Sequence, residues 1–311
     1  MTERLSEHPS PGPAAPPVGR LPEAVVIGAA KAGTTALAEY LRRHPQMFVS
    51  PVKEPEFFSH DEIFAQGFDW YKELFAEAGP EQVCLEASTS YTRWPEHPLA
   101  ASRLAAAMPD ARLIYLLRHP VDRAWSHYVH RLTKELHRDE PVPATFEEHV
   151  KRDPVCLNSS RYMDQLEQYL AFYPPNSLLV LFNDDLAHDT AATLSRVCEF
   201  LGVTDRGGEL ARLDTSWYRN ARTVQGRVRH RVMAPLKASR LLRTASRFVP
   251  QVGRDAVYEL LIRTRRGREI ARQYVPPPML PETRLELIEH FRPHNDRLAR
   301  FLNVDLSQWN R

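Results

Sequence analysis

The chain has 311 residues, of which 43% are hydrophobic and 26% are charged, and its formal net charge is +2. This is an ordinary globular composition, and the length permits one large α/β domain or two small ones. The near balance of charges gives no indication of a nucleic-acid partner, and the three cysteines have no metal-ligand spacing. Because no apolar run approaches a membrane span and no signal-peptide core is recognisable, we expect a cytoplasmic location.

The order of predicted elements indicates the fold class. Prolines crowd the first twenty residues and predict a disordered arm over 1–20, followed by a single domain over 21–311. Apolar runs predict strands at residues 25–27, 47–49, 83–86, 112–117 and 178–182. Helical patterns occupy residues 34–43, 99–108, 121–136, 162–173, 191–201 and 281–301, and Pro293 is expected to break or bend the last. This alternation predicts an α/β fold with a mostly parallel central sheet and helices on both faces.

The first predicted strand runs into a loop of small residues, Gly28-Ala29-Ala30-Lys31-Ala32-Gly33, and then into a helix that opens with Thr34 and Thr35. Side chains this small let a ligand approach the backbone. The N–H groups and the dipole at the start of a helix attract anions. The stretch therefore predicts an anion site, although a plain strand-to-helix turn with a solvated Lys31 would have the same pattern.

The position of the lysine separates this loop from that of a P-loop NTPase. Gly28 and Gly33 have the spacing of G-x-x-x-x-G-K-[ST], but Thr34 stands at the lysine position and the lysine lies earlier, at Lys31. The K-x-G-T-T pattern resembles the 5′-phosphosulfate loop of sulfotransferases that use 3′-phosphoadenosine-5′-phosphosulfate (PAPS). The resemblance implies a P-loop NTPase-like three-layer architecture. It also implies that PAPS contacts Lys31, Ala32, Gly33, Thr34 and Thr35.

A second motif, Arg118-His119-Pro120-Val121-Asp122-Arg123-Ala124-Trp125-Ser126-His127-Tyr128, follows the predicted strand at 112–117. An arginine and a hydroxyl that arrive together suit a phosphate monoester, because the guanidinium pairs with two oxygens. The motif resembles the 3′-phosphate motif of the same family, R-[DN]-P-x-x-R-x-x-S-x-Y, with His119 as a departure. The resemblance implies that Arg118 and Ser126 bind the 3′-phosphate and that Tyr162 flanks the adenine. Arg222 and Arg227 loosely match the family's loop that closes over this phosphate.

A third motif, Lys53-Glu54-Pro55-Glu56-Phe57-Phe58, is predicted to be a loop because of its prolines. It resembles the K-E-x-x-F-F element of the branch that includes heparan sulfate and bacterial sulfotransferases. By this resemblance Glu54 is the catalytic base that takes the acceptor proton, and Glu56 is the second candidate. Heparan-type enzymes carry a lysine after the strand glutamate, where this chain has Ala87. That departure argues against a heparan-like polysaccharide acceptor.

Three polar clusters, at residues 28–35, 86–90 and 118–126, directly follow predicted strands. Ligands of open parallel sheets lie beyond the carboxyl ends of the strands, so we expect these clusters to converge on one crevice. A separate segment, residues 225–272, holds thirteen Arg or Lys against three Asp or Glu. We expect it to be helical and packed on the core by its leucines, or else to form a lid or a surface for an anionic acceptor, partner or lipid.

Together the motifs predict a sulfotransferase that moves the sulfuryl group of PAPS to a hydroxyl, in preference to an amine, of a small-molecule, lipid or carbohydrate acceptor. Lys31 and Glu54 are the predicted catalytic residues, and no residue cluster in the sequence requires a metal. Two alternatives stay open. A P-loop nucleotide kinase would need a lysine at position 34, although Glu86 could hold its Mg²⁺. A non-catalytic anion- or membrane-binding protein would use the segment at 225–272.

Overall fold

The computed structural model describes residues 19–135, 145–213, 264–265 and 276–311. Residues 1–18 of the predicted arm lie outside this part of the chain. So does the predicted basic segment at 225–272, apart from Thr264 and Arg265.

A single five-stranded sheet with the strand order β2-β3-β1-β4-β5 forms the centre of the molecule. Every neighbouring pair of strands is parallel, which confirms the predicted sheet. The strands are β1 (Ala24–Gly28), β2 (Met47–Val49), β3 (Val83–Ala87), β4 (Arg112–Leu117) and β5 (Leu178–Phe182). All residues of β1, and all but Arg112 in β4, are buried. Their unbroken apolar runs reflect a sheet that is covered on both faces.

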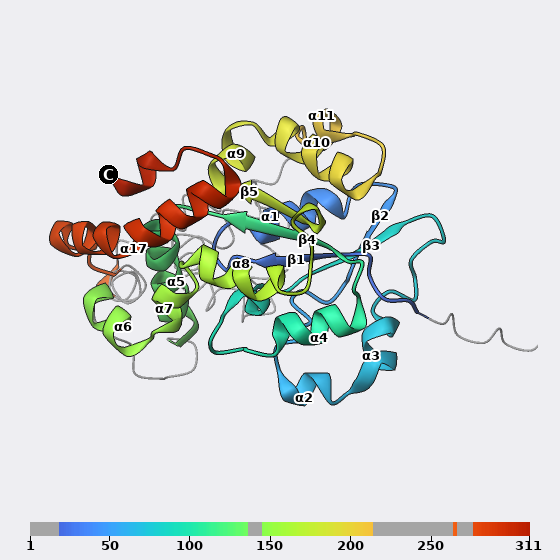
Figure 1. The fold of residues 1–311 in the computed structure, drawn as a ribbon, viewed down its shortest axis with the longest axis horizontal. Coiled ribbons are helices and arrows are strands. Elements are labelled where there is room, and N and C mark those ends of the chain that lie inside the picture. Colours follow the sequence, from blue (N-terminus) through green and yellow to red (C-terminus); the bar gives the residue numbers. More distant parts are fainter. Residues whose placement is uncertain (1–18, 136–144, 214–263, 266–275) are drawn as a thin grey trace, which may run out of the picture.

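Helices cover both faces, as the alternating pattern predicts (Figure 1). Helices α1 and α10 lie on one side of the sheet. The residues that follow these helices are in contact, since His44 Nε2 lies 2.9 Å from the Thr204 carbonyl oxygen. Helices α4 and α8 lie on the other side. The first eight α-helices are α1 (Thr34–Leu41), α2 (Asp61–Phe64), α3 (Gly67–Glu73), α4 (Ala100–Ala107), α5 (Pro120–Glu135), α6 (Phe146–Arg152), α7 (Val155–Asn158) and α8 (Tyr162–Leu170). The others described are α9 (Asn183–His188), α10 (Thr190–Leu201), α11 (Gly207–Leu210) and α17 (Pro281–Leu302), with 3₁₀ turns η1 (Thr89–Thr92), η2 (Pro175–Ser177) and η3 (Ser307–Asn310).

Helix α17 corrects the first of the two outcomes expected at Pro293, a break, because it continues from Pro281 to Leu302. Proline removes one backbone hydrogen bond from the interior of a helix. Buried residues on both sides of Pro293, among them Phe291 and Leu298, hold the helix on the rest of the protein. Tertiary packing therefore outweighs the local cost of the proline.

A second, smaller apolar core joins α5, α6, α7 and α17 beside the main one. Its buried residues are Val121, Ala124, Tyr128, Phe146, Cys156, Leu287, Ile288 and Phe291. An ion pair between Arg284 and Asp122, with 2.8 Å between Nη1 and Oδ1, also connects α17 to the start of α5. The four helices group at one end of the sheet (Figure 1). They therefore fix the helix that carries the second motif.

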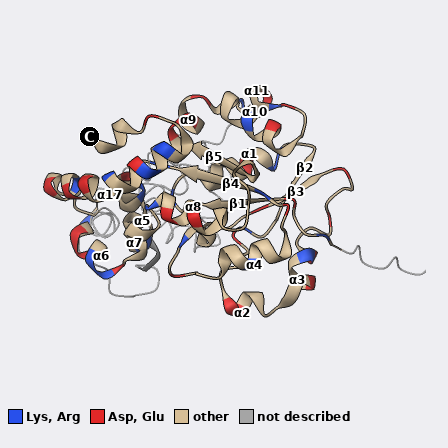
Figure 2. Ribbon diagram, viewed as in Figure 1, with Lys and Arg blue, Asp and Glu red and all other residues tan. Residues whose placement is uncertain are grey.

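Helices α6 and α17 each carry both Lys or Arg and Asp or Glu (Figure 2). Among the described residues, no helix combines the length and the apolar character needed to cross a membrane.

Candidate active site

The loop between β1 and α1 depends on two glycines that other side chains approach closely. Gly28 has φ +156°, and a Cβ there would lie 2.0 Å from Thr92 Oγ1. Gly33 has φ +103°, and a Cβ there would lie 2.7 Å from Asn183 Nδ2. The same two neighbours hold the loop, since Thr92 donates to the Ile27 carbonyl at 3.0 Å and Asn183 to the Ala32 carbonyl at 2.8 Å. Only glycine fits both positions, which explains the spacing in the sequence.

Lys31 sits at the turn of this loop in the left-handed region, with φ +74°. Two residues later, Gly33 is the N-cap of α1, and no side chain caps that end of the helix. The first helical residue, Thr34, is buried and Thr35 is half-buried. The first N–H groups of a helix have no carbonyl partner within the helix, and the positive end of the helix dipole lies at this end of α1, next to the loop that holds Lys31. A helix start of this kind favours an anion.

Arg118 brings the second motif to the same loop. Its Nη1 donates to the Lys31 carbonyl at 3.5 Å. Tyr162, which is 1% exposed, donates its hydroxyl to the Arg118 carbonyl at 2.6 Å. Burial raises the pKa of Tyr162 to about 12, so the hydroxyl stays protonated and continues to donate. Tyr162 thus fixes the backbone of Arg118, and its expected contact with an adenine remains a prediction.

Arg123 belongs to the second motif, but the sequence alone indicated no role for it. It is fully buried and donates from Nε to Ser160 Oγ at 2.5 Å and from Nη1 to the Ala30 carbonyl at 3.4 Å. Its Nη2 donates to the Cys156 carbonyl. The side chain therefore ties the loop to α7 and α5, and Ser126 lies half-buried in α5 just beyond it. In the sequence, the signal for this role was the position of Arg123 as the second arginine of the motif.

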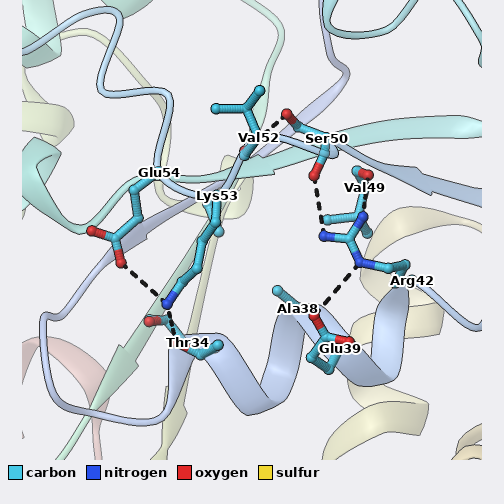
Figure 3. A pocket seen from close by; sticks show the side chains of 11 residues that line it. Thr34, Ala38, Glu39, Arg42, Val49, Ser50, Val52, Lys53 and Glu54 are labelled. Carbon is cyan, nitrogen blue, oxygen red and sulfur yellow. Dashed lines mark hydrogen bonds and ion pairs between the residues drawn. The ribbon is translucent and has the colours of Figure 1, made fainter. Parts of the chain in front are cut away.

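Glu54 lies beside Lys53 near the start of α1 (Figure 3). Lys53 Nζ lies 2.6 Å from Thr35 Oγ1 and 3.7 Å from Glu54 Oε1. Thr89, which follows β3, donates its hydroxyl to Glu54 Oε2 at 3.4 Å. Glu54 itself has φ +54°, a conformation that non-glycine residues adopt rarely. The carboxylate is thus held, 30% exposed, beside the residues that open the helix.

A buried carboxylate holds the rest of the loop at residues 53–58 in place. Glu86 in β3 is fully buried and accepts hydrogen bonds from Tyr71 at 3.0 Å, Tyr91 at 2.6 Å and Ser88 at 2.7 Å. Ser88 Oγ accepts from the Glu56 backbone N–H at 2.9 Å, and the Tyr91 hydroxyl accepts from that of Phe58 at 3.3 Å. Glu86 therefore positions the loop through two hydroxyls.

Phe57 and Phe58 fix the loop further, because both rings are fully buried and pack on Tyr71 at centroid distances of 4.5 and 5.2 Å. Glu56 directly precedes Phe57 and, like Glu54, has a positive φ, of +57°. These contacts hold in place the loop that carries Glu54 and Glu56.

Burial raises the pKa of Glu86 from 4.5 to about 7. The folded protein therefore binds this proton more tightly than the unfolded chain, so the contribution of Glu86 to stability is fully present below pH 4.5 and is lost as the pH rises to about 7. We expect a loss of about 3 kcal/mol across that window, and Glu86→Gln should remove it. Urea unfolding of both proteins at pH 5 and pH 8 measures the effect, with the exposed Glu77→Gln as the control. An equal pH dependence in wild type and Glu86→Gln would contradict it.

The structure thus brings the three expected clusters to the carboxyl ends of three adjacent strands, β3, β1 and β4. Arg118 contacts the Lys31 carbonyl, and Lys53, which pairs with Glu54, contacts Thr35. Arg222 and Arg227 lie outside the described residues. A small pocket opens where Glu54 meets α1. It is lined by Thr34, Thr35, Ala38, Glu39, Arg42, Val49, Ser50, Val52, Lys53, Glu54 and Ala87.

Known proteins are similar to this chain in sequence and in fold. Heparan sulfate glucosamine 3-O-sulfotransferase 3B1 of Homo sapiens is 33% identical over 193 residues, which cover 59% of this chain and 47% of that protein. Heparan sulfate glucosamine 3-O-sulfotransferase 6 of Homo sapiens is 32% identical over 194 residues, which cover 60% and 55%. The chain thus spans about half the length of the curated relatives it matches.

A solved structure agrees over a larger share of the chain. The sulfotransferase from Alicyclobacillus acidocaldarius superposes with a TM-score of 0.62 at 25% identity, over 94% of this chain and 100% of that one. The three-layer architecture expected from the loop is therefore confirmed. A family model described as "Sulfotransferase domain" matches residues 21–229, the part of the sequence that contains all three motifs. The chain belongs to the sulfotransferase family.

Proposed function

We propose that this protein transfers the sulfuryl group of PAPS to a hydroxyl of an acceptor molecule. The acceptor oxygen attacks sulfur in line, and the bond between sulfur and the bridging oxygen of PAPS breaks. Adenosine 3′,5′-bisphosphate leaves with that bond's electron pair, and a carboxylate of the enzyme takes the acceptor proton. The family supports sulfuryl transfer, and we propose PAPS as the donor and a hydroxyl as the acceptor group.

One observation supports the proposal: the loop with Lys31, the Arg118 side chain and Glu54 all lie near the start of α1. Arg118 Nη1 reaches the Lys31 carbonyl at 3.5 Å, and Glu54 connects to Thr35 through Lys53. A donor that carries a 5′-phosphosulfate and a 3′-phosphate needs two cationic positions next to each other. An acceptor needs a base on the far side of the sulfur. Lys31 and Arg118 would supply the two cations, and Glu54 would supply the base.

The loop would hold the 5′-phosphosulfate on the backbone N–H groups at the start of α1. Lys31 would neutralise the charge that develops on the bridging oxygen as the S–O bond breaks. Preorganised charges of this kind often make the largest contribution to catalysis. Arg118 would pair with the 3′-phosphate, assisted by the Ser126 hydroxyl.

Glu54 would act as the general base. Thr89 and Lys53 hold its carboxylate from two sides, at 3.4 and 3.7 Å, so that one oxygen lone pair can face the acceptor. General-base assistance suits this step because an aliphatic hydroxyl has a high pKa and must lose its proton as the new bond forms.

The pocket beside Glu54 favours an uncharged acceptor. Each of its two cations has an acidic neighbour, since Arg42 Nε lies 3.6 Å from Glu39 Oε1 and Lys53 Nζ lies 3.7 Å from Glu54 Oε1 (Figure 3). Arg42 is further engaged by the Val49 and Ser50 carbonyls at 2.9 and 3.1 Å. Ala87 lines the same pocket without a charge. The names of the relatives indicate a sugar hydroxyl, and we propose a neutral sugar or another neutral alcohol here.

The donor site predicts a preference for adenosine 3′,5′-bisphosphate over AMP. At a ligand concentration of ~100 times Kd, binding should add about 2 to 3 kcal/mol to the stability and raise the melting temperature by several degrees. Arg118→Ala removes a charged hydrogen bond to the 3′-phosphate, so its Kd for the bisphosphate should rise about 10- to 100-fold. Thermal-shift titrations with both nucleotides measure this, and Arg152→Ala at the exposed end of α6 is the control.

Equal affinity of the wild type for the bisphosphate and AMP would refute the donor. Magnesium-dependent turnover of ATP would favour the kinase alternative instead. Vesicle binding that survives Lys31→Ala, with no sulfuryl transfer to any acceptor, would favour a non-catalytic binding protein.

A further inference from the structure

A cluster of three metal-ligand side chains, formed by His127, His149 and Asp153, lies apart from the motifs that the proposed function uses. The candidate ligand atoms all lie within 4.8 Å of one another. Asp153 Oδ2 is 3.5 Å from His127 Nε2 and 3.7 Å from His149 Nε2. Ligands of a tetrahedral zinc ion stand about 3.4 Å apart, given Zn–N and Zn–O distances near 2.1 Å. The three atoms therefore converge at nearly the spacing of a metal's coordination shell.

The two histidines are buried without hydrogen bonds at the nitrogens that converge. His127 is 7% and His149 is 3% exposed. Neither Nε2 has a hydrogen-bond partner among the described residues. Buried polar atoms are rarely left unpaired, and each such atom in a folded protein needs an explanation. A neutral imidazole nitrogen is the form of histidine that binds a metal.

The carboxylate of Asp153 is divided between two tasks. Its Oδ1 accepts from the Val155 backbone N–H at 3.1 Å, at the start of α7. That contact leaves Oδ2 pointing at the two imidazoles. The rings themselves are held in place, since they stack on each other with centroids 5.9 Å apart and His149 packs on Tyr128 at 5.2 Å. Ligands that are oriented by such surrounding contacts are typical of metal sites.

One positive charge competes for the same oxygen. Arg131 Nε lies 3.9 Å from Asp153 Oδ2, and the Arg131 side chain is 44% exposed. A side chain with this exposure can turn toward solvent when a cation takes its position. The competition lowers the metal affinity without closing the site.

We propose that His127, His149 and Asp153 bind one divalent transition metal ion, for which zinc is the best match, with water as the fourth ligand. Two imidazole nitrogens and one carboxylate oxygen suit zinc, whereas Mg²⁺ and Ca²⁺ prefer oxygen ligands alone. The ion connects α5 to α6 and to the start of α7. Arg123 and Ser126 lie on the same helix as His127, so the ion stabilises the helix that carries the proposed 3′-phosphate site.

The test uses the full chain without a polyhistidine tag, dialysed against a chelator and titrated with Co²⁺ and then with Zn²⁺. We expect one equivalent of Co²⁺ to give the visible absorption of a tetrahedral complex, and one equivalent of Zn²⁺ to displace it. Asp153→Asn keeps the Oδ1 acceptor for Val155 and should weaken Zn²⁺ binding about tenfold or more, as should His149→Gln. The matched control is His188→Gln, an exposed histidine on α9, which should bind as the wild type does. Arg131→Gln should bind at least as tightly.

A wild-type protein that takes up no Co²⁺ or Zn²⁺ in this titration overturns the proposal, and that measurement does not depend on how the variants fold. Uptake that Asp153→Asn, His149→Gln and His188→Gln share equally with the wild type also overturns it. Neither result bears on the donor, which the nucleotide titrations test separately.

Discussion

Lys31→Ala should lower kcat for sulfuryl transfer about 10²- to 10³-fold, which corresponds to about 3 to 4 kcal/mol of transition-state stabilisation. The lysine sits at φ +74° in the loop before α1, where its position is fixed by the turn. It would face charge that appears only as the S–O bond breaks. We therefore expect kcat and kcat/KM to fall together, because the lost interaction belongs to the transition state. Steady-state kinetics with PAPS and any accepted alcohol measure this.

Two matched variants make the result specific to Lys31. Lys151→Ala removes a lysine from the exposed end of α6 and should leave kcat unchanged. Lys31→Arg keeps the charge but not the compact ammonium, so it should restore only part of the rate. Bisphosphate binding should survive Lys31→Ala, because Arg118 still pairs with the 3′-phosphate. A Lys31→Ala enzyme with wild-type kcat would show that the lysine has no part in the chemistry.

The displaced lysine is better understood from the fold than from the motif. A lysine at position 34 would lie in the first turn of α1, where Thr34 is buried. Lys31 instead lies in the loop, and its own backbone carbonyl accepts the hydrogen bond from Arg118. In the proposed mechanism a cation on the loop side would face the leaving oxygen of a short phosphosulfate, while the helix N-terminus would hold its phosphate.

The sequence was sufficient to predict the sheet, because β1, β4 and β5 are short apolar runs that end in polar residues. It was also sufficient to predict that the polar clusters at residues 28–35, 86–90 and 118–126 gather at one edge, since parallel strands share a carboxyl end. Strand order was not predictable from these runs, because pairing depends on contacts between residues far apart in the chain. The interruption expected at Pro293 was wrong because burial of α17 on both sides of the proline is a tertiary effect.

Other features depend on long-range contacts that no local pattern announces. The Glu86 network joins β3 to the 53–58 loop through Tyr71, Tyr91 and Ser88. The histidine and aspartate cluster combines a pair four residues apart, His149 and Asp153, with His127 from another helix. The pair alone is common on helices, and only the fold brings the third ligand to it.

Glu54→Gln should lower kcat about 10²- to 10⁴-fold, the usual contribution of a general base, while the protein stays folded and binds the bisphosphate normally. The amide keeps the size of the carboxylate and still accepts from Thr89. Its loss of charge breaks only a partly exposed pair with Lys53, which contributes about 1 kcal/mol or less to stability. A fall in turnover without a change in the bisphosphate-induced melting shift would therefore reflect the missing base.

Glu56→Gln is the matched control, because Glu56 stands two residues away in the same anchored loop and also has a positive φ. Its backbone N–H bonds to Ser88, so its place in the loop does not depend on the side-chain charge. We expect Glu56→Gln to keep most of the wild-type rate. The opposite pattern, with turnover retained in Glu54→Gln and lost in Glu56→Gln, would move the base by one carboxylate and leave the donor site unchanged. Loss of turnover in both variants, with bisphosphate binding intact, would mean that the two carboxylates share the acceptor's proton.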